Sequence, residues 1–342
     1  EVLNGEFLIN PLNLNYDLIS LRIALSNIDV VVSPGYIVLQ AIGRLNKDYF
    51  KYLLHRYDVA YMKLLGSGVR QTISFAHIAN SLLLSPPLKE QTAIANFLDR
   101  KTAQIDKAIA QKEKLIELLK ERRQILIHKA VTRGRDATVP MKDSGVEWIG
   151  EIPSHWEVKR LKYVADLIGD KASSKQNPLQ YIGMENVESW SGNHVASETE
   201  VEGIAACFKS GDVLFGKLRP YLAKVYLAKK DGICTTEFLV YRTRRGYSNH
   251  FLQTVMLSNG FIGLIDSSTY GSKMPRANSS FIGNQLIPTP PIEEQEKIVD
   301  YLKLVTQKML SVKSFFENEI TSLKEYKSTL INAAVTGKIK VV

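Results

Sequence analysis

Residues 86–134 of this chain read PPLKEQTAIANFLDRKTAQIDKAIAQKEKLIELLKERRQILIHKAVTRG, and residues 290–338 read PPIEEQEKIVDYLKLVTQKMLSVKSFFENEITSLKEYKSTLINAAVTGK. The second stretch repeats the first without a gap, 204 positions later (290 − 86). A register kept over that distance indicates two copies of one structural unit. Two prolines end whatever precedes them and acidic residues follow in the next turn, so each copy is predicted to be one long helix.

Both predicted helices carry seam positions at alternating spacings of three and four, which is the pattern of a coiled coil. Each seam must be buried, and the nearest apolar partner is the other copy. At about 1.5 Å of rise per residue, such a helix of roughly 45 residues would span on the order of 65 Å and act as a spacer. Two ordinary helices buried in separate cores remain the alternative. The apolar seam residues are Leu98, Ile105, Ile109, Ile116, Leu119 and Leu126 in the first copy, and Leu302, Met309, Phe316, Ile320, Leu323 and Leu330 in the second.

Length and composition predict a folded chain of about two domains. The chain has 342 residues, 45% hydrophobic and 23% charged, with no run long and apolar enough to cross a bilayer. Cys207 and Cys234 are its only cysteines, too few for a disulfide framework, so a cytoplasmic location is expected. A formal net charge of +9 permits a polyanionic partner without proving one.

The repeat divides the chain into segments. We expect a first globular domain at 1–85, a spacer helix at 86–134, a linker at 135–147, a second globular domain at 148–289 and a second spacer helix at 290–342. Apolar and β-branched runs predict strands at Ser81–Leu84 and Ile233–Thr243, and helical spacing predicts one helix over Ser248–Ile265.

The two globular segments also repeat, more loosely. Asn4–Ile9 lines up with Ser210–Phe215, so Glu1 corresponds to about Cys207. The first domain then has no counterpart of residues 148–206. We expect a fragment of a longer chain, because half a domain would leave strand edges open and a core unfilled. A truncated form with one working domain is the alternative.

No catalytic or metal-binding constellation is recognisable in the sequence. There is no P-loop, no H-E-x-x-H and no histidine pair at ligand spacing. The Pro-Pro pairs at 86 and 290 lack the preceding amide or acid and the following aromatic that an amino-methyltransferase uses on a flipped base. Glu157-Val158-Lys159 matches only the second half of a metal-dependent nuclease motif.

Two loops of the second domain carry clustered cations. Gly211–Lys224 places three cations and a tyrosine around a proline turn, and Gly271–Arg276 adds two more cations on small residues. Lysine and arginine in such loops suit phosphate contact and the reading of base edges. An exposed hairpin without ligand is the alternative for each loop.

Together these stretches resemble a specificity subunit of a type I restriction-modification system. The resemblance covers essentially the whole chain. It depends on the Gly-Val-Glu-Trp-Ile-Gly-Glu-Ile-Pro run at 145–153, Gly211–Lys224, Thr236-Glu237-Phe238, Lys273–Arg276 and the two Pro-Pro-x-x-Glu-Gln helices with their Ala-Val-Thr ends. It implies an α+β fold in which two α/β target-recognition domains, the first incomplete here, are separated by two long antiparallel coiled-coil helices.

The resemblance also implies what the chain does. It would be a non-catalytic, sequence-specific DNA-binding subunit that reads a bipartite site on double-stranded DNA. Methyltransferase subunits, which bind S-adenosylmethionine, and restriction subunits, which use ATP and Mg²⁺, would assemble on it, and the chain would hold no cofactor itself. By the same resemblance the DNA contacts fall on Lys217, Arg219, Tyr221, Lys224, Lys273 and Arg276, with Arg70 as the weaker counterpart in the first domain.

Two other classes of function stay open from the residues alone. One is an assembly scaffold whose globular domains bind protein and not DNA. The other is a self-contained nuclease that uses Glu157. Steep salt dependence of DNA binding would distinguish the specificity subunit from the scaffold, and cleavage with Mg²⁺ alone would indicate the nuclease.

Overall fold

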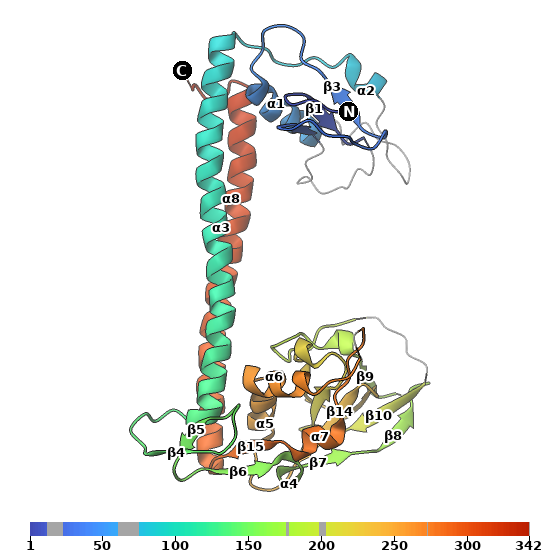
Figure 1. The fold of residues 1–342 in the computed structure, drawn as a ribbon, viewed down its shortest axis with the longest axis vertical. Helices are drawn as coiled ribbons and strands as arrows, with labels where there is room; N and C mark the ends of the chain where they lie inside the picture. Colours follow the sequence, from blue (N-terminus) through green and yellow to red (C-terminus); the bar gives the residue numbers. More distant parts are fainter. Residues whose placement is uncertain (12–22, 61–74, 176–177, 198–202, 272, 342) are drawn as a thin grey trace. The chain divides into compact units, whose positions relative to one another are not determined.

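The computed structural model describes residues 1–11, 23–60, 75–175, 178–197, 203–271 and 273–341 (Figure 1). It divides into two compact units, which we describe one at a time. Unit 1 comprises residues 1–115 and 314–342, and unit 2 comprises residues 116–313. The longest elements are the helices α3 (Leu88–Arg133) and α8 (Ile292–Val335), and each unit contains a segment of both.

The two long helices pair in antiparallel fashion, as the coiled-coil prediction requires (Figure 1). In unit 1, Lys327 on α8 donates to both carboxylate oxygens of Asp106 on α3, at 2.7 Å each. Further along, Lys112 on α3 donates to Glu319 on α8 at 2.7 Å. The residue number rises on one helix while it falls on the other, so the helices run in opposite directions.

Every apolar residue predicted for the seam is buried or half-buried. Leu98 is fully buried, whereas the neighbouring positions Asp99 and Arg100 are exposed. Beyond the predicted seam, Ile127 is only 4% exposed because it leaves the helix pair and enters the core of the second domain.

The first domain, in unit 1, is a small antiparallel sheet with the order β2-β1-β3. Phe7, Ile9 and Ile23 of the sheet pack with Leu54 of the adjoining helix to form its buried cluster. The strand predicted at Ser81–Leu84 is wrong, because these residues are irregular. The elements of this domain are β1 (Phe7–Ile9), β2 (Ile23–Leu25), β3 (Ile37–Leu39), α1 (Lys47–Ala60) and α2 (Phe75–Ala79).

The second domain, in unit 2, is built on two four-stranded sheets with the orders β8-β10-β13-β9 and β12-β11-β14-β7. Two strand pairs, β4-β5 and β6-β15, complete it. The strands are β4 (Met141–Asp143), β5 (Glu151–Pro153), β6 (Glu157–Arg160), β7 (Ala165–Ile168), β8 (Lys171–Ser173), β9 (Gln180–Ile182), β10 (Ile204–Phe208), β11 (Val213–Gly216), β12 (Val225–Leu227), β13 (Gly232–Thr235), β14 (Phe238–Thr243) and β15 (Leu286–Thr289). The short helices are α4 (Leu161–Val164), η2 (Met184–Asn186), η3 (Pro220–Leu222), α5 (Asn249–Met256), α6 (Asn259–Ser267) and α7 (Ser279–Asn284).

Two predicted elements of the second domain are each divided in two. The single strand predicted at Ile233–Thr243 is β13 and β14, which belong to different sheets. The single helix predicted at Ser248–Ile265 is α5 and α6. Its division occurs at Ser258, whose hydroxyl accepts from the backbone N–H of Phe261 and so caps a new helix inside an apolar run.

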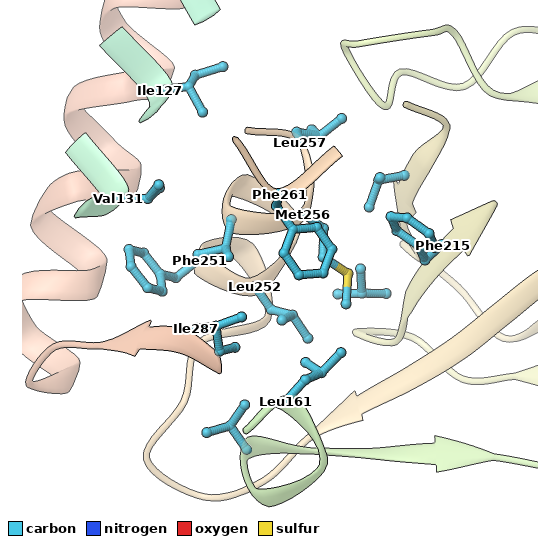
Figure 2. Close-up of a cluster of buried hydrophobic side chains, with 14 of the residues drawn as sticks. Ile127, Val131, Leu161, Phe215, Phe251, Leu252, Met256, Leu257, Phe261 and Ile287 are labelled. Carbon is cyan, nitrogen blue, oxygen red and sulfur yellow. The ribbon is translucent and has the colours of Figure 1, made fainter. Parts of the chain in front are cut away.

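The core of unit 2 joins the end of α3 to the second domain. Figure 2 shows Ile127 and Val131 of α3 facing the cluster that contains Phe251 and Phe261. Trp156, which follows β5, is completely buried in the same cluster. Burying an aliphatic or aromatic side chain contributes about 1.5–3 kcal/mol, so this contact fixes the helix end to the domain. No helix in the described part of the chain is long and apolar enough to cross a membrane.

Candidate nucleic-acid interface

The first cationic loop leaves the core at the end of β11, a strand buried along its whole length. Asp212, immediately before this strand, is 1% exposed, and its carboxylate accepts hydrogen bonds from Nε (2.8 Å) and Nη2 (2.7 Å) of Arg242. A buried carboxylate with a bidentate arginine is geometrically well defined. Lys217, the residue that follows the strand, therefore extends from a rigid backbone.

The loop then turns through two residues in the left-handed region. Arg219 has φ = 50° and Ala223 has φ = 46°, on either side of η3. This conformation costs about 1–2 kcal/mol for a residue with a side chain, so it persists only where other contacts fix it. Strained backbone of this kind is common at functional sites.

A second loop, residues 270–278, supplies those contacts. The backbone N–H of Arg219 donates to the carbonyl of Pro275 at 2.8 Å, and that of Ala277 donates to the carbonyl of Lys217 at 2.9 Å. The Arg219 guanidinium adds a bond to the Lys273 carbonyl at 3.2 Å. Residues 217–224 and 270–278, with residue 272 outside the description, thus form one structure that we call the loop pair.

Glu237 fastens the loop pair to the sheet. Its carboxylate accepts from Nε and Nη2 of Arg276 at 3.0–3.2 Å, and its carbonyl accepts from the backbone N–H of Lys217 at 2.9 Å. The hydrogen bonds to Glu237 raise the pKa of the Arg276 guanidinium. Glu237 therefore compensates the charge of Arg276. In the absence of DNA this ion pair holds the second loop in place.

The outer surface of the loop pair combines cations with large side chains. Arg219 and Lys273 are exposed and Lys217 is half-buried, and none of the three forms an ion pair with a described residue. Tyr221 is 45% exposed. The sequence reasoning missed Tyr270, which is 84% exposed; an aromatic residue directly before the Gly271 loop was the available signal.

Lys224 has a different environment from the other predicted contacts. Its ammonium donates to the carbonyls of Met184 (2.6 Å) and Val187 (2.9 Å), and burial lowers its pKa. The side chain thus holds η2 against the loop pair and does not extend toward solvent. Arg70, the predicted counterpart in the first domain, lies outside the described residues.

A second surface in unit 2 is a groove of about 870 Å³ between residues 188–193 and the unit 2 segments of α3 and α8. Arg123 of α3 donates from Nη1 to the carbonyl of Trp190 at 2.7 Å, and burial lowers the pKa of this arginine. The N–H of Trp190 donates to the carbonyl of Ala223 at 3.1 Å. One hydrogen-bonded path therefore connects the spacer helix to the loop pair. We call the groove of about 870 Å³ described above the helix groove.

Metal-binding clusters are absent from the described ranges. No group of three or more His, Cys, Asp or Glu side chains among these residues could hold a metal ion. Glu157 lies on β6, is exposed, and forms an ion pair with Lys159 at 2.8 Å. These hydrogen-bond and charge effects of Lys159 lower the pKa of Glu157.

Comparison with known proteins places the chain in a family. The family model described as the type I restriction modification DNA specificity domain matches residues 19–118 and 153–321. The EcoDI specificity subunit of Escherichia coli is 26% identical over 320 residues, covering 86% of this chain and 70% of the relative. The MjaVIII specificity subunit of Methanocaldococcus jannaschii is 26% identical over 329 residues, covering 91% and 75%.

Solved structures share the fold. A chain from a structure described as the basis of complex assembly and conformational transition of the type I R-M system superposes with a TM-score of 0.70 at 14% identity, covering 98% of this chain and 82% of that one. The HsdS subunit of Thermoanaerobacter tengcongensis gives 0.54 at 16% identity, covering 99% and 82%. With the family model matching most of its length, the chain belongs to the type I restriction-modification DNA specificity family, whose members are recognition subunits and not catalytic ones.

Proposed function

We propose that the loop pair of the second domain reads one half of a bipartite target on double-stranded DNA. The observation that supports this most directly is the set of hydrogen bonds between the two loops, which holds the backbones of Lys217, Arg219 and Lys273 together and also fixes the Arg219 guanidinium. A cation that is already ordered loses little conformational entropy on binding, so its contact with DNA contributes more to affinity.

The residues of the loop pair would divide the work. Arg219 is the candidate for base reading, because a guanidinium can donate two hydrogen bonds to a guanine edge. Lys217 and Lys273 suit phosphates, which fix the register of the protein on the duplex. Tyr221 would lie against the backbone or a base edge. Arg276 and Lys224 would act indirectly, by holding the loops in place.

The first domain would read the other half of the site. Its sheet carries β1 at the position that β11 occupies in the second domain, with neighbours on both sides. Arg70 remains the candidate cation there. In place of the Lys217–Pro220 turn this domain has a neutral segment at 10–15, so we expect fewer phosphate contacts from it.

We further propose that methyltransferase subunits, which carry S-adenosylmethionine, dock on the helix pair, and that ATP- and Mg²⁺-dependent restriction subunits join them in the cytoplasm. Large apolar side chains are exposed on the unit 2 segments of α3 and α8 although the seam is already buried. Unburied apolar side chains on a helix pair suit a protein interface. These residues are Leu118, Ile125, Leu304, Leu310 and Val312, at 41–55% exposure, and Ile125 and Leu310 among them line the helix groove.

The test is selection from a random-sequence DNA pool by this chain co-expressed with its methyltransferase subunit. Enrichment of a two-part motif with a fixed gap is the expected result. A single half-site would restrict reading to the second domain. No enrichment would contradict DNA recognition and favour an assembly scaffold. Binding should also weaken as salt rises, with a log-log slope of about −0.9 per phosphate contact.

A further inference from the structure

The glutamine of each Pro-Pro-x-x-Glu-Gln motif is buried. Gln91 is 3% exposed and Gln295 is 0% exposed, and both lie in the first turns of the long helices. A buried amide costs about 1–3 kcal/mol unless its donors and acceptor find partners. Both side chains find them, and the partners are equivalent in the two units.

In unit 1, Gln91 connects the start of α3 to the start of α1. Its Nε2 donates to the carbonyl of Pro86 at 2.8 Å, and its Oε1 accepts from the backbone N–H of Asn46 at 2.9 Å. Asn46 is itself the cap of α1, because its Oδ1 accepts from the N–H of Tyr49 at 2.9 Å. The amide thus bridges the spacer helix and the first domain.

In unit 2, Gln295 makes the same bridge. Its Nε2 donates to the carbonyl of Pro290 at 2.8 Å, and its Oε1 accepts from the backbone N–H of Ser248 at 2.7 Å. Ser248 caps α5, with its hydroxyl accepting from the N–H of Phe251. A further bond from Nε2 reaches the carbonyl of Gly246 at 3.3 Å. The same contact occurs in both units although the capping residues differ. We therefore regard it as a structural feature of the repeated unit.

We infer that Gln91 and Gln295 are positioning residues that set the angle of each globular domain on its spacer helix, and thereby the gap between the two half-sites. In unit 2 the proline pair alone separates β15 from α8, and in unit 1 the proline pair follows the irregular residues 80–85 and leads directly into α3. Each glutamine ties the N-terminus of a domain helix, α1 in the first domain and α5 in the second, to the proline carbonyl and so restrains the backbone at that point. Since one base-pair step is about 3.4 Å along the duplex, a small rotation at this point is enough to change the preferred gap.

This inference rests on the proposed function, and two measurements keep their failures apart. We call the bridge that each glutamine makes between a domain helix and the proline carbonyl the clamp, and the clamp variants are Gln91→Glu and Gln295→Glu. Glutamate retains an oxygen for the N–H of Asn46 or Ser248 but places a second oxygen against the proline carbonyl. The matched controls are Gln104→Glu and Gln307→Glu, because these glutamines are exposed on the same helices and the change of charge is identical.

The first measurement is selection from the random DNA pool with the co-expressed complex. Each clamp variant should keep both half-site sequences and accept gaps one base pair shorter or longer, whereas the controls keep the wild-type gap. An unchanged gap in both clamp variants overturns the inference. Loss of half-site binding in step with loss of thermal stability also overturns it, because the glutamine would then only stabilise the fold. No enrichment by the wild type overturns the proposed function and this inference with it.

The second measurement needs no DNA. Spin labels at cysteines introduced for Lys230 of the second domain and Lys308 of α8, with Cys207 and Cys234 replaced by serine, report a distance distribution within unit 2. Both labelled positions are exposed. Gln295→Glu should broaden that distribution, and Gln307→Glu should not. Identical distributions in the two proteins overturn the clamp even if DNA selection succeeds.

Discussion

The two globular domains start from the same sheet and differ in what is added to it. In the first domain β1 has β2 and β3 as neighbours, and in the second β11 has β12 and β14 in the same antiparallel arrangement. The second domain adds β7 beyond β14 and fills its core from residues 149–165. In the first domain apolar side chains such as Ile42 and Leu82 are more than 90% exposed. The shared sheet sets the topology of both domains, whereas the added segment enlarges the core of the second.

We expect the largest effect, a loss of stability, from removing the buried side chain of Trp156, which belongs to the added residues 149–165. Trp156→Ala should destabilise the second domain by about 3–5 kcal/mol, because the indole is fully buried and its Nε1 donates to Glu294 at 2.9 Å. Hydrogen exchange measured peptide by peptide distinguishes the two units, so protection should fall in residues 149–289 and stay unchanged in residues 1–60. Trp156→Phe should cost less, and the exposed neighbour variant His155→Ala should cost little. Equal loss of protection in both units would contradict the separate cores.

The next effect concerns DNA and compares the two domains directly. Arg219→Ala should lower affinity by about 1–3 kcal/mol and relax preference at one base pair, if Arg219 reads a guanine. Arg70→Ala should lower affinity less. Titration of the co-expressed complex against the selected site and single-base variants measures both, with exposed Lys230→Ala as the control. An Arg219→Ala protein with wild-type affinity and preference would remove this residue from the interface.

The predictions made from the sequence are confirmed where nearby residues determine the secondary structure. They fail where contacts between residues distant in the sequence determine it. The long helices follow from a repeated pattern and proline starts, and α3 and α8 are present as expected. The strand expected at Ser81–Leu84 fails because its counterpart β15 exists by pairing with β6, and the first domain has no equivalent of β6 in the described residues. A strand edge without a partner gains little from an extended conformation.

At the candidate site the sequence identified residue types but not their partners. The cations at 217–224 and 273–276 were visible as charge clusters. That Arg276 pairs with Glu237 across 39 positions, and that Lys224 serves two carbonyls of η2, depends on the packing of separate sheets. Lys224 and Arg219 look equivalent in the sequence, whereas only Arg219 is exposed.

The pair formed by Arg276 and Glu237 provides a finer test of this difference. Arg276→Gln should leave the salt slope of DNA binding nearly unchanged, because its charge is already compensated. Glu237→Gln should steepen the slope by up to about 0.9, because it frees the guanidinium for a phosphate. Binding titrations of both variants over a range of salt concentrations measure the slopes. A flatter slope in Arg276→Gln would mean that the arginine leaves Glu237 and contacts phosphate in the complex.

The smallest effect is a pH dependence confined to one unit. His128 of α3 lies beside Trp148 with 6.5 Å between ring centroids, and burial lowers the pKa of its imidazole from 6.5. Because the unfolded chain takes up this proton at higher pH than the folded chain, the stability of unit 2 should fall as pH drops below 6.5 and level off below the folded pKa. The equivalent position in α8 is Asn332 (128 + 204), which does not titrate and accepts from Arg56.

His128→Gln should therefore remove part of the acid sensitivity of unit 2 and leave unit 1 unchanged. Hydrogen exchange at about pH 7.5 and 5.5, corrected for intrinsic exchange rates, measures the two units in one sample. Asn332→His is the reciprocal variant, and it should make unit 1 more sensitive to acid only if the imidazole becomes buried against the first domain as it is against the second. If His128→Gln keeps the wild-type pH profile in unit 2, the folded chain binds the proton as readily as the unfolded chain, and the burial of this imidazole does not distinguish the two helix ends.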